Sequence, residues 1–375
     1  MKILLVGPAN SIHIVRWANG LFDNGHSVYL YSCHRSMSGY RDGIKIIRAK
    51  HKSPIGYVIN GGDLARNANE ISPDIINIHY ATGYGLLARL SRVYKKHPTL
   101  LSVWGSDVYD FPYKSFLHRW ILRGNLLVAD KIASTSLCMA KQTKIIAPEI
   151  DSISITPFGV DISIFSIREK KNRNNKIVIG TVKTMSYKYG IDTLINSFSL
   201  LLKRLKEKGV KTPLLELRLV GGGEQLQELK ALCESLGIVQ YVDFIGQVAH
   251  DEVPCELEKL DIYVALSRLD SESFGVAILE ASASGKPVLV SDAGGLPEVT
   301  IDGVTGIVVP RNNPQAAAQA LERMVLDAHL RHQMGIAGQQ HVANNYAWDV
   351  CINTMLATYQ STISSFKMSQ SCKKS

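Results

Sequence analysis

The chain has 375 residues, of which 46% are hydrophobic and 20% charged, and its formal net charge is +9. This length favours two domains over a single core, and the apolar content excludes an intrinsically disordered protein. No apolar run reaches the roughly 18–20 residues that a membrane-spanning helix needs, and six cysteines without a C-x-x-C pair argue against a disulfide framework or a zinc site.

The positive charge lies almost entirely in the first half of the chain. Residues 1–165 hold 19 Lys and Arg against 11 Asp and Glu, whereas residues 166–375 hold 23 against 22. A basic half suits an acidic partner, such as an anionic membrane surface, a phosphorylated acceptor or nucleic acid. Charge that serves only general solubility gives the same pattern, and nucleic acid is disfavoured because no interleaved aromatic platform or known module is present.

Residues 1–165 alternate short apolar runs with amphipathic stretches. The apolar runs predict buried strands at 2–7, 26–32, 74–79, 99–105 and 131–135. The first run ends at Gly7-Pro8 and is too short for the apolar segment of a signal peptide. Helices are predicted between the strands, at 11–24, 57–71 and 84–96. Such alternation indicates a parallel sheet covered on both faces.

The second half repeats this alternation. Its strands are predicted at 176–182, 215–221, 241–246, 261–267, 287–291 and 305–309, and its helices near 190–208, 224–236, 251–258, 275–284 and 314–328. The polar stretch 165–177 predicts an interdomain linker. We therefore expect an α/β protein with two Rossmann-like, doubly wound domains, 1–165 and 166–345, that face a cleft. Residues 346–365 predict a last helix that packs back towards the N-terminal domain, and 366–375 a disordered tail.

Two lysines follow the first strand of the second half, just before a predicted helix. The ammonium groups of Lys183 and Lys188 beside a helix N-terminus suit a diphosphate, although a solvated basic loop would have the same composition. In "LVGGGEQ", Gly222 and Gly223 would let the backbone approach a ligand closely. The full G-x-G-x-x-G spacing is absent, so an ordinary strand–helix turn also fits. Ile245, at the end of "YVDFIG", could offer main-chain groups to a nucleotide base.

Two glutamates flank the predicted helix start in "SESFGVAILE". Glu272 precedes the helix, Glu280 lies about one and a half turns inside it, and the amides of Phe274, Gly275 and Val276 would point at an anion. Carboxylates accept hydrogen bonds from vicinal hydroxyls. The stretch therefore predicts a site for a nucleoside diphosphate sugar, with ribose at Glu280 and the sugar at Glu272. Two solvated acids on an amphipathic helix are the alternative, and a metal held by Asp270 and Glu272 is disfavoured because the lysines already supply positive charge.

The same residues resemble a known family. "ESFGVAILE" is similar to the Glu-seven-residues-Glu signature of the retaining nucleotide-sugar glycosyltransferases of family four, which have the GT-B fold. "PFGVDISIF", "VKTMSYKYGIDTLINSF", "LVGGGEQ", "VDFIGQV" and "GGLPEVTIDGVTGIVVP" follow the family's order. "NSIHIVRWANGLFDNGHSVYL" and "SVWGSDVYDFP" resemble bacterial members that build surface polysaccharide. The resemblance implies transfer with retention, with Glu272 at the donor sugar, Glu280 at the ribose and both lysines at the diphosphate. Since the lysines supply the positive charge, no metal or other cofactor is expected.

The chain departs from the family pattern at two positions. Arg is usual where Lys183 stands, and lysine keeps the charge but loses the bidentate fork. Many relatives have His-Gly-x-Asp where this chain has Trp104-Gly-Ser-Asp107. Asp107 is expected to be catalytic together with Glu272 and Lys188. His13, His79, Trp104 and Asp107 are expected at the acceptor site, with a structural role as the alternative for both histidines.

The sequence thus predicts a hexosyltransferase that moves a sugar from a UDP- or GDP-sugar to a hydroxyl of a glycan or lipid-linked acceptor, in O-antigen, capsule or lipopolysaccharide biosynthesis. We expect a cytoplasmic protein, peripheral on the inner membrane face through its basic N-terminal half. The segment "KSFLHRWILR" around His118 fits either a membrane contact or an ordinary packed helix. Two other functions stay open: an epimerase or hydrolase of the same fold, and a non-catalytic nucleotide-sugar-binding subunit, which Trp104 favours.

Overall fold

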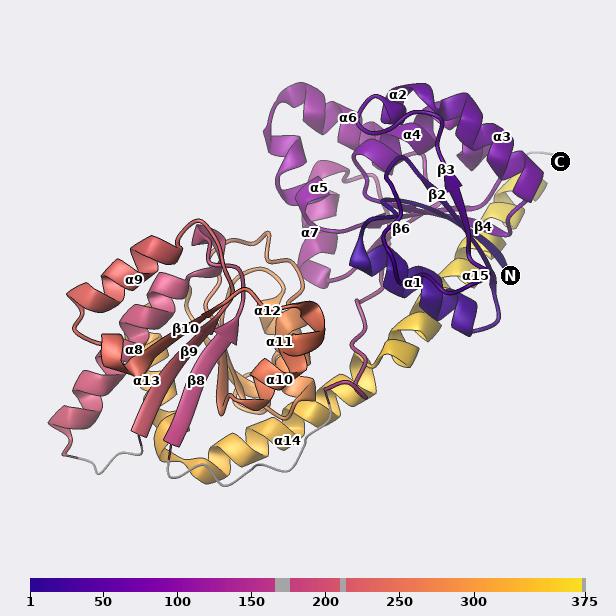
Figure 1. The fold of residues 1–375 in the computed structure, drawn as a ribbon. Helices are drawn as coiled ribbons and strands as arrows, with labels where there is room; N and C mark the ends of the chain where they lie inside the picture. The colour runs from indigo at the N-terminus through magenta and orange to yellow at the C-terminus, as the bar shows by residue number, and fades with distance from the viewer. Residues whose placement is uncertain (166–175, 210–213, 373–375) are drawn as a thin grey trace. The chain divides into compact units, whose positions relative to one another are not determined.

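The structure is a computed structural model that describes residues 1–165, 176–209 and 214–372. The chain forms two compact units (Figure 1). Unit 1 comprises Met1–Pro157 with Asp349–Ser375, and unit 2 comprises Phe158–Trp348. The chain thus enters unit 2 before residue 165, and most of the predicted linker 165–177 lies outside the described residues.

Unit 1 is built on a seven-stranded parallel sheet with the order β3-β2-β1-β4-β5-β6-β7. The strands are β1 (Lys2–Val6), β2 (Ser27–Ser32), β3 (Lys45–Arg48), β4 (Ile75–His79), β5 (Thr99–Val103), β6 (Lys131–Ser134) and β7 (Ile153–Ile155). All the strands predicted here are confirmed, but β3 and β7 were not predicted. Both are short edge strands without a fully buried residue, so they lack the apolar run by which a central parallel strand is recognised.

The helices of unit 1 are α1 (Ile12–Asp23), α2 (Gly56–Ile59), α3 (Gly61–Ile71), α4 (Gly83–Ser91), α5 (Ser106–Tyr109), α6 (Phe116–Leu126), α7 (Leu137–Ile146) and α15 (Trp348–Cys372). The predicted helix 57–71 is interrupted at Asn60. The Asn60 amide donates to the carbonyl of His51 at 2.8 Å and accepts from its N–H at 3.1 Å. A side chain that pairs in this way with a preceding segment competes with a continuous helix.

Helix α15 packs on the sheet of unit 1. The Asn77 side chain on β4 donates to the Tyr359 hydroxyl at 2.8 Å and accepts from the Ser102 hydroxyl on β5 at 2.9 Å, all of them buried. The helix continues to Cys372, so the predicted disordered tail is wrong for residues 366–372, whereas residues 373–375 lie outside the described part. Residues 366–372 contain neither Pro nor Gly, so nothing in their backbone stops the helix.

Tyr359→Phe should lower the free energy of unfolding of unit 1 by about 1–3 kcal/mol, because the Asn77 amide would lose its oxygen acceptor in a buried place. Urea unfolding followed by circular dichroism measures this change. Tyr241→Phe, at an exposed tyrosine of unit 2, is the matched control and should have almost no effect. Equal stability of the two variants would contradict the buried network.

Unit 2 is built on a six-stranded parallel sheet with the order β10-β9-β8-β11-β12-β13. Its strands confirm every strand predicted in this half: β8 (Lys176–Val182), β9 (Leu214–Val220), β10 (Val242–Gly246), β11 (Ile262–Ala265), β12 (Val288–Ser291) and β13 (Gly306–Val309). The helices are α8 (Ile191–Glu207), α9 (Leu226–Ser235), α10 (Val253–Glu258), α11 (Val276–Ala283), α12 (Leu296–Val299), α13 (Pro314–Leu326) and α14 (Ala328–Asn345). The sequence did not predict α14, whose few apolar residues do not form a clear helical stripe.

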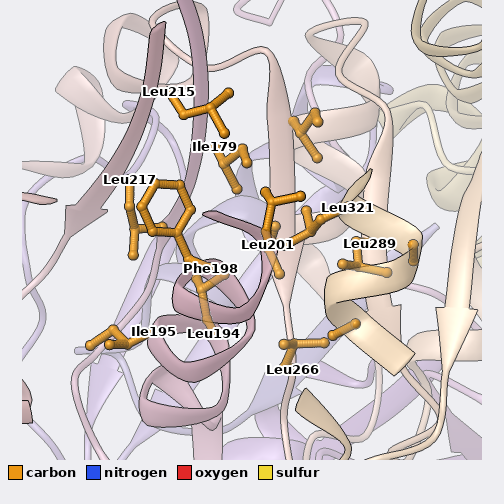
Figure 2. Packing of buried hydrophobic residues seen from close by; sticks show 14 of the residues in the cluster. Ile179, Leu194, Ile195, Phe198, Leu201, Leu215, Leu217, Leu266, Leu289 and Leu321 are labelled. Carbon is orange, nitrogen blue, oxygen red and sulfur yellow. The ribbon is translucent and has the colours of Figure 1, made fainter. Parts of the chain in front are cut away.

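The core of unit 2 fixes the position of α8 (Figure 2). Phe198 and Leu201 on this helix are fully buried and belong to one cluster with Ile179 of β8 and Leu217 of β9. The helix starts directly after Gly190, whose φ is 62°. A Cβ at Gly190 would lie 2.1 Å from the Leu266 carbonyl oxygen, so only glycine fits this turn. The core therefore holds the loop between β8 and α8, which carries both candidate lysines.

Within the described ranges, no helix combines the length and the apolar character that crossing a membrane requires.

Candidate functional site

Three charged side chains of unit 2 form what we call the lysine–glutamate cluster: Lys183, Lys188 and Glu272. The ammonium of Lys183 lies 2.8 Å from Oε1 of Glu272, and that of Lys188 lies 3.5 Å from Oε2. Lys188 also donates to the Ser271 carbonyl at 2.8 Å. Both ammonium groups lie over the Tyr189 ring, 4.6 and 5.4 Å from its centre. The structure thus brings together three residues that the sequence had assigned to one site.

The cluster is charged although it is largely buried. Burial by itself would raise the pKa of Glu272, but the ammonium groups of Lys183 and then Lys188 outweigh it and hold that pKa below its usual range. Burial would likewise lower the pKa of Lys183, but Glu272 raises it well above the ordinary value. Two ammonium groups against one carboxylate leave a net positive charge, which favours an anionic ligand.

The N-terminus of α11 lies directly after the cluster in the chain. Gly275, with φ of 94°, caps the helix, and the Phe274 ring packs against Phe158 and Tyr346 at 6.0 Å in each case. The first N–H groups of such a helix have no carbonyl partner within the helix. Glu280 is buried inside α11. Burial raises the pKa of the Tyr263 hydroxyl; Lys183 opposes this increase, and the Glu280 and Glu272 carboxylates add to it.

The loops after β8, β9 and β10 are joined through their backbones. Lys183 donates to the Val220 carbonyl at 2.9 Å, and Gly221 donates to the Gly246 carbonyl at 2.8 Å. A Cβ at Gly221 would lie 2.0 Å from the Lys183 carbonyl oxygen. The glycines of this turn therefore allow the loops to touch, and the predicted donor residues Gly222, Gly223 and Ile245 lie along the joined loops, partly or fully exposed.

A further loop, which the sequence analysis did not assign to the site, supports Glu272. Gly295 in the loop after β12 donates to the Glu272 carbonyl at 3.0 Å, and a Cβ at Gly294 would lie 2.4 Å from the same oxygen. Arg311 pairs with Asp270 at 2.8 Å and with Asp292 at 3.0 Å. Each carboxylate of the Asp270–Glu272 pair is thus already bound to a cation, and the part of the chain that is described contains no His, Cys, Asp or Glu cluster suited to a metal ion.

Arg268, at the end of β11, was also missed. Its backbone N–H donates to the Lys188 carbonyl at 2.8 Å, and its guanidinium pairs with Asp192 on α8 and donates to the Asn312 side chain at 2.8 Å. It lines a hollow of about 380 Å³ together with residues of α8 and α9. No member of the lysine–glutamate cluster lines this hollow. Arg268 therefore holds the loop that carries Lys188 through contacts that do not involve the lysine–glutamate cluster's charged groups.

In unit 1, four rings gather at the carboxyl ends of β1, β4 and β5. Ring centres of His13, His79 and Tyr80 lie 5.6, 5.0 and 4.8 Å from that of Trp104. We call them the Trp104 cluster. Tyr80 has a φ of 71°, a strained conformation for a bulky residue that is found preferentially at functional sites. The cluster contains three of the four predicted acceptor residues.

Asp107, the fourth, is buried beneath these loops. Its carboxylate accepts hydrogen bonds from the backbone N–H groups of Ala81, Trp104 and Gly105, at 3.0, 3.1 and 2.9 Å. Burial raises the pKa of Asp107 while these donors oppose the increase. The carboxylate therefore fixes the loops after β4 and β5 together, which makes Asp107 a positioning residue for Trp104.

His79 should make stability depend on pH. It is fully buried, neither ring nitrogen has a hydrogen-bond partner among the described residues, and burial lowers its pKa to about 3. An unfolded histidine titrates near 6.5, so the unfolded state binds more protons below that pH, and stability falls as pH decreases. Between pH 8 and pH 5, His79 should lower the free energy of unfolding of the wild type by about 2 kcal/mol, and His79→Leu should abolish this contribution. Urea unfolding at both pH values tests this, with exposed His332→Leu as control; an unchanged pH dependence in His79→Leu would contradict it.

Solved structures with the same architecture include sucrose-phosphate synthase from Thermosynechococcus elongatus, with 17% identity and a TM-score of 0.79 over 97% of this chain and 99% of that chain. Anabaena HepE, in complex with UDP and glucose, shares 16% identity with a TM-score of 0.75 over 96% of this chain and 100% of that chain. Two parallel α/β sheets with these likenesses define the GT-B fold, which confirms the predicted fold class.

Two family models match the sequence: "Glycosyl transferase 4-like" over residues 2–136 and "Glycosyl transferases group 1" over residues 163–341. The second half of the chain is thus similar to group 1 glycosyltransferases, and the first half to glycosyl transferase 4-like proteins. A GDP-mannose-dependent alpha-(1-6)-phosphatidylinositol monomannoside mannosyltransferase of Mycobacterium tuberculosis is 28% identical over 211 residues, which are 53% of this chain and 53% of that protein. The chain thus spans about half the length of this curated relative.

Proposed function

We propose that the protein transfers a sugar from a nucleoside diphosphate sugar to a hydroxyl of a glycan or lipid-linked acceptor, with retention of configuration, in cell-surface polysaccharide biosynthesis. The observation that carries the proposal is the lysine–glutamate cluster. It places two ammonium groups and a carboxylate directly before the N-terminus of α11. Cationic groups of this kind match a diphosphate, and the carboxylate matches sugar hydroxyls.

The cluster would act mainly on the leaving group. Negative charge grows on the diphosphate as the glycosidic bond breaks, and Lys183 and Lys188 would stabilise it most in the transition state. In the structure both lysines contact Glu272. A diphosphate would compete with this carboxylate for the ammonium groups, which would free Glu272 to bind hydroxyls of the sugar. The two lysines supply the positive charge, so no step in this scheme requires a metal ion.

The rest of the donor would lie along the joined loops of unit 2. Buried Glu280 suits the ribose hydroxyls, and the partly exposed Gly222 and Ile245 suit the base. Both bases have precedent among the similar proteins, since the mycobacterial mannosyltransferase is named as GDP-mannose-dependent and HepE was solved with UDP. We therefore propose UDP or GDP as the leaving nucleotide.

The acceptor would lie at the Trp104 cluster. The partly exposed Trp104 offers an apolar ring face of the kind that packs on sugars. His79 is fully buried, with its ring centre 5.0 Å from that of Trp104, and would support this ring from the protein side. A lipid-linked acceptor would bring the protein to the cytoplasmic face of a membrane, in agreement with the basic charge of residues 1–165.

Glu272→Gln tests the proposed function. The variant keeps the side-chain size but loses the carboxylate charge, so it should bind UDP or GDP at least as well as the wild type while transfer falls by about 100-fold or more. Titration calorimetry measures binding, and mass spectrometry with UDP- and GDP-sugars plus a polyprenyl-linked acceptor measures transfer. Glu224→Gln, at an exposed glutamate of the glycine loop, is the matched control.

The same assay separates the other candidate functions. When the donor is incubated without an acceptor, an epimerase would produce a new sugar nucleotide and a hydrolase would release free sugar. Either product would form as fast as it does with an acceptor present. A binding subunit would retain nucleotide affinity and show no turnover with any acceptor. Either result would exclude transfer as the activity.

A further inference from the structure

We propose that unit 1 docks on an anionic lipid bilayer through one continuous surface made by α2, α4 and α6. We call it the docking face and define it by its exposed apolar residues: Ile55, Val58 and Ile59 of the α2 region, Leu90 of α4, and Phe116, Leu117 and Trp120 of α6. The proposal adds a membrane-contact surface to the proposed function. It depends on that function only for the expectation that the acceptor is lipid-linked.

The docking face is apolar on its outer side. Phe116 is 85% exposed, Ile55 67% and Trp120 54%. The inner sides of the same helices are already occupied, because Leu87 of α4 and Leu122 of α6 belong to the buried core of unit 1. The outward side chains therefore have no role in that core. A contiguous group of large exposed apolar side chains indicates an interaction site.

The three helices form one surface, since α4 packs against both α2 and α6 (Figure 1). The Arg89 guanidinium of α4 lies 5.5 Å from the centre of the Trp120 ring on α6. On the other side, a Cβ at Gly83 of α4 would lie 2.5 Å from the Tyr57 ring of α2. These contacts hold the helices side by side, so their exposed residues belong to a single layer that covers one face of the sheet.

The charge of this layer matches anionic lipid. Segments 43–62, 75–106 and 111–129 contain no Asp or Glu. Their exposed cations are Lys45, Arg48, Lys50, Lys52, Arg92, Lys95, Lys96 and Lys114. Arg123 of α6 is paired with Glu149, which lies outside these segments. Apolar side chains that insert among head groups, surrounded by lysine and arginine, are the combination that binds peripheral proteins to anionic bilayers. A second copy on the same face would instead bring like charges together.

The docking face also begins at the proposed acceptor site. Helix α4 starts at Gly83, shortly after Ala81, whose N–H binds Asp107, and Asn125 near the end of α6 donates to the Ala81 carbonyl at 3.0 Å. The start of α4 and the end of α6 therefore lie at the edge of the sheet where the Trp104 cluster lies. An acceptor whose lipid anchor remains in the bilayer could reach this edge when the docking face lies on the membrane.

Vesicle co-sedimentation of the full chain tests the proposal. The wild type should bind phosphatidylcholine vesicles that contain one third phosphatidylglycerol, bind pure phosphatidylcholine poorly, and be released by high salt. Phe116→Ser with Trp120→Ser should reduce binding by about tenfold or more. Lys95→Gln, Lys96→Gln and Lys114→Gln together should reduce it by roughly fivefold for each charge removed.

Matched variants in unit 2 should leave vesicle binding unchanged: Val239→Ser with Val304→Ser for exposed apolar residues, and Lys203→Gln with Lys206→Gln for exposed cations. The proposal fails if the wild type ignores anionic vesicles, or if the Phe116/Trp120 variant binds them as well as the wild type. It also fails if analytical ultracentrifugation shows a wild-type dimer that the Phe116/Trp120 variant loses while the wild type binds no vesicles. That result would make this face a contact between two copies of the chain. Titration of the same samples with UDP and GDP tests the proposed donor site separately. Nucleotide binding should be the same in all these variants, because no residue of the lysine–glutamate cluster is changed.

Discussion

Lys183→Met should lower kcat/KM for sugar transfer by about 10²–10³-fold. The substitution keeps most of the aliphatic side chain and removes the ammonium that lies 2.8 Å from Glu272. The departing diphosphate would then lose one of its two cationic partners. Glu272, which stays buried, would retain only the more distant Lys188 at 3.5 Å, so its pKa should rise and nucleotide affinity should fall. Steady-state kinetics with the matching donor and calorimetric titration of the nucleotide measure both effects.

Two further variants make the result specific. Lys183→Arg should keep transfer within about tenfold, since guanidinium preserves the charge and adds a fork suited to phosphate. Lys203→Met, at an exposed lysine of α8, should behave as the wild type. Full activity in Lys183→Met would remove the lysine–glutamate cluster from the catalytic scheme.

Phe198→Ala should lower the free energy of unfolding of unit 2 by about 3–5 kcal/mol. The ring is fully buried on α8 and lies among Leu194, Leu201 and Leu217 (Figure 2). Truncation leaves a cavity between α8 and the sheet, which the close-packed surroundings fill only in part. Thermal unfolding followed by circular dichroism should show a midpoint lower by roughly 10 °C for the transition of this unit.

The control for this prediction is the same substitution at an exposed phenylalanine. Phe116→Ala, on the docking face of unit 1, should change stability by no more than about 0.5 kcal/mol, because the Phe116 side chain is 85% exposed. A similar loss of stability in both variants would show that burial does not explain the effect at Phe198. Since α8 holds the lysine loop, Phe198→Ala should also weaken nucleotide binding near its melting temperature.

The central strands could be predicted from the sequence because parallel strands buried on both faces appear as short continuous apolar runs. This holds for β8, predicted with its observed bounds at 176–182. The edge strands β3 and β7 lack such runs, and α14 lacks a clear apolar stripe, so none of them was predicted. The break at Asn60 depends on a contact with His51, which no local pattern reveals.

The candidate site shows the same division. Lys183, Lys188 and Glu272 were found because their residue types stand next to a predicted strand end and helix start. Arg268 and Arg311 were missed, because an arginine in a loop has no local signal that tells which backbone or carboxylate it will meet. Asp107 was expected to be catalytic, but its three backbone donors come partly from a loop more than twenty residues earlier in the chain.

The sequence by itself determined the α/β class, the order of the buried strands and the residue types around the donor site. These properties depend on hydrophobic periodicity and on residues close together in the chain. Only the tertiary structure decided that Glu272 pairs with lysines about ninety residues away and that apolar residues of three separate helices share one exposed face. Such contacts arise from how the elements pack, and the free energy of packing depends on neighbours that are distant in sequence.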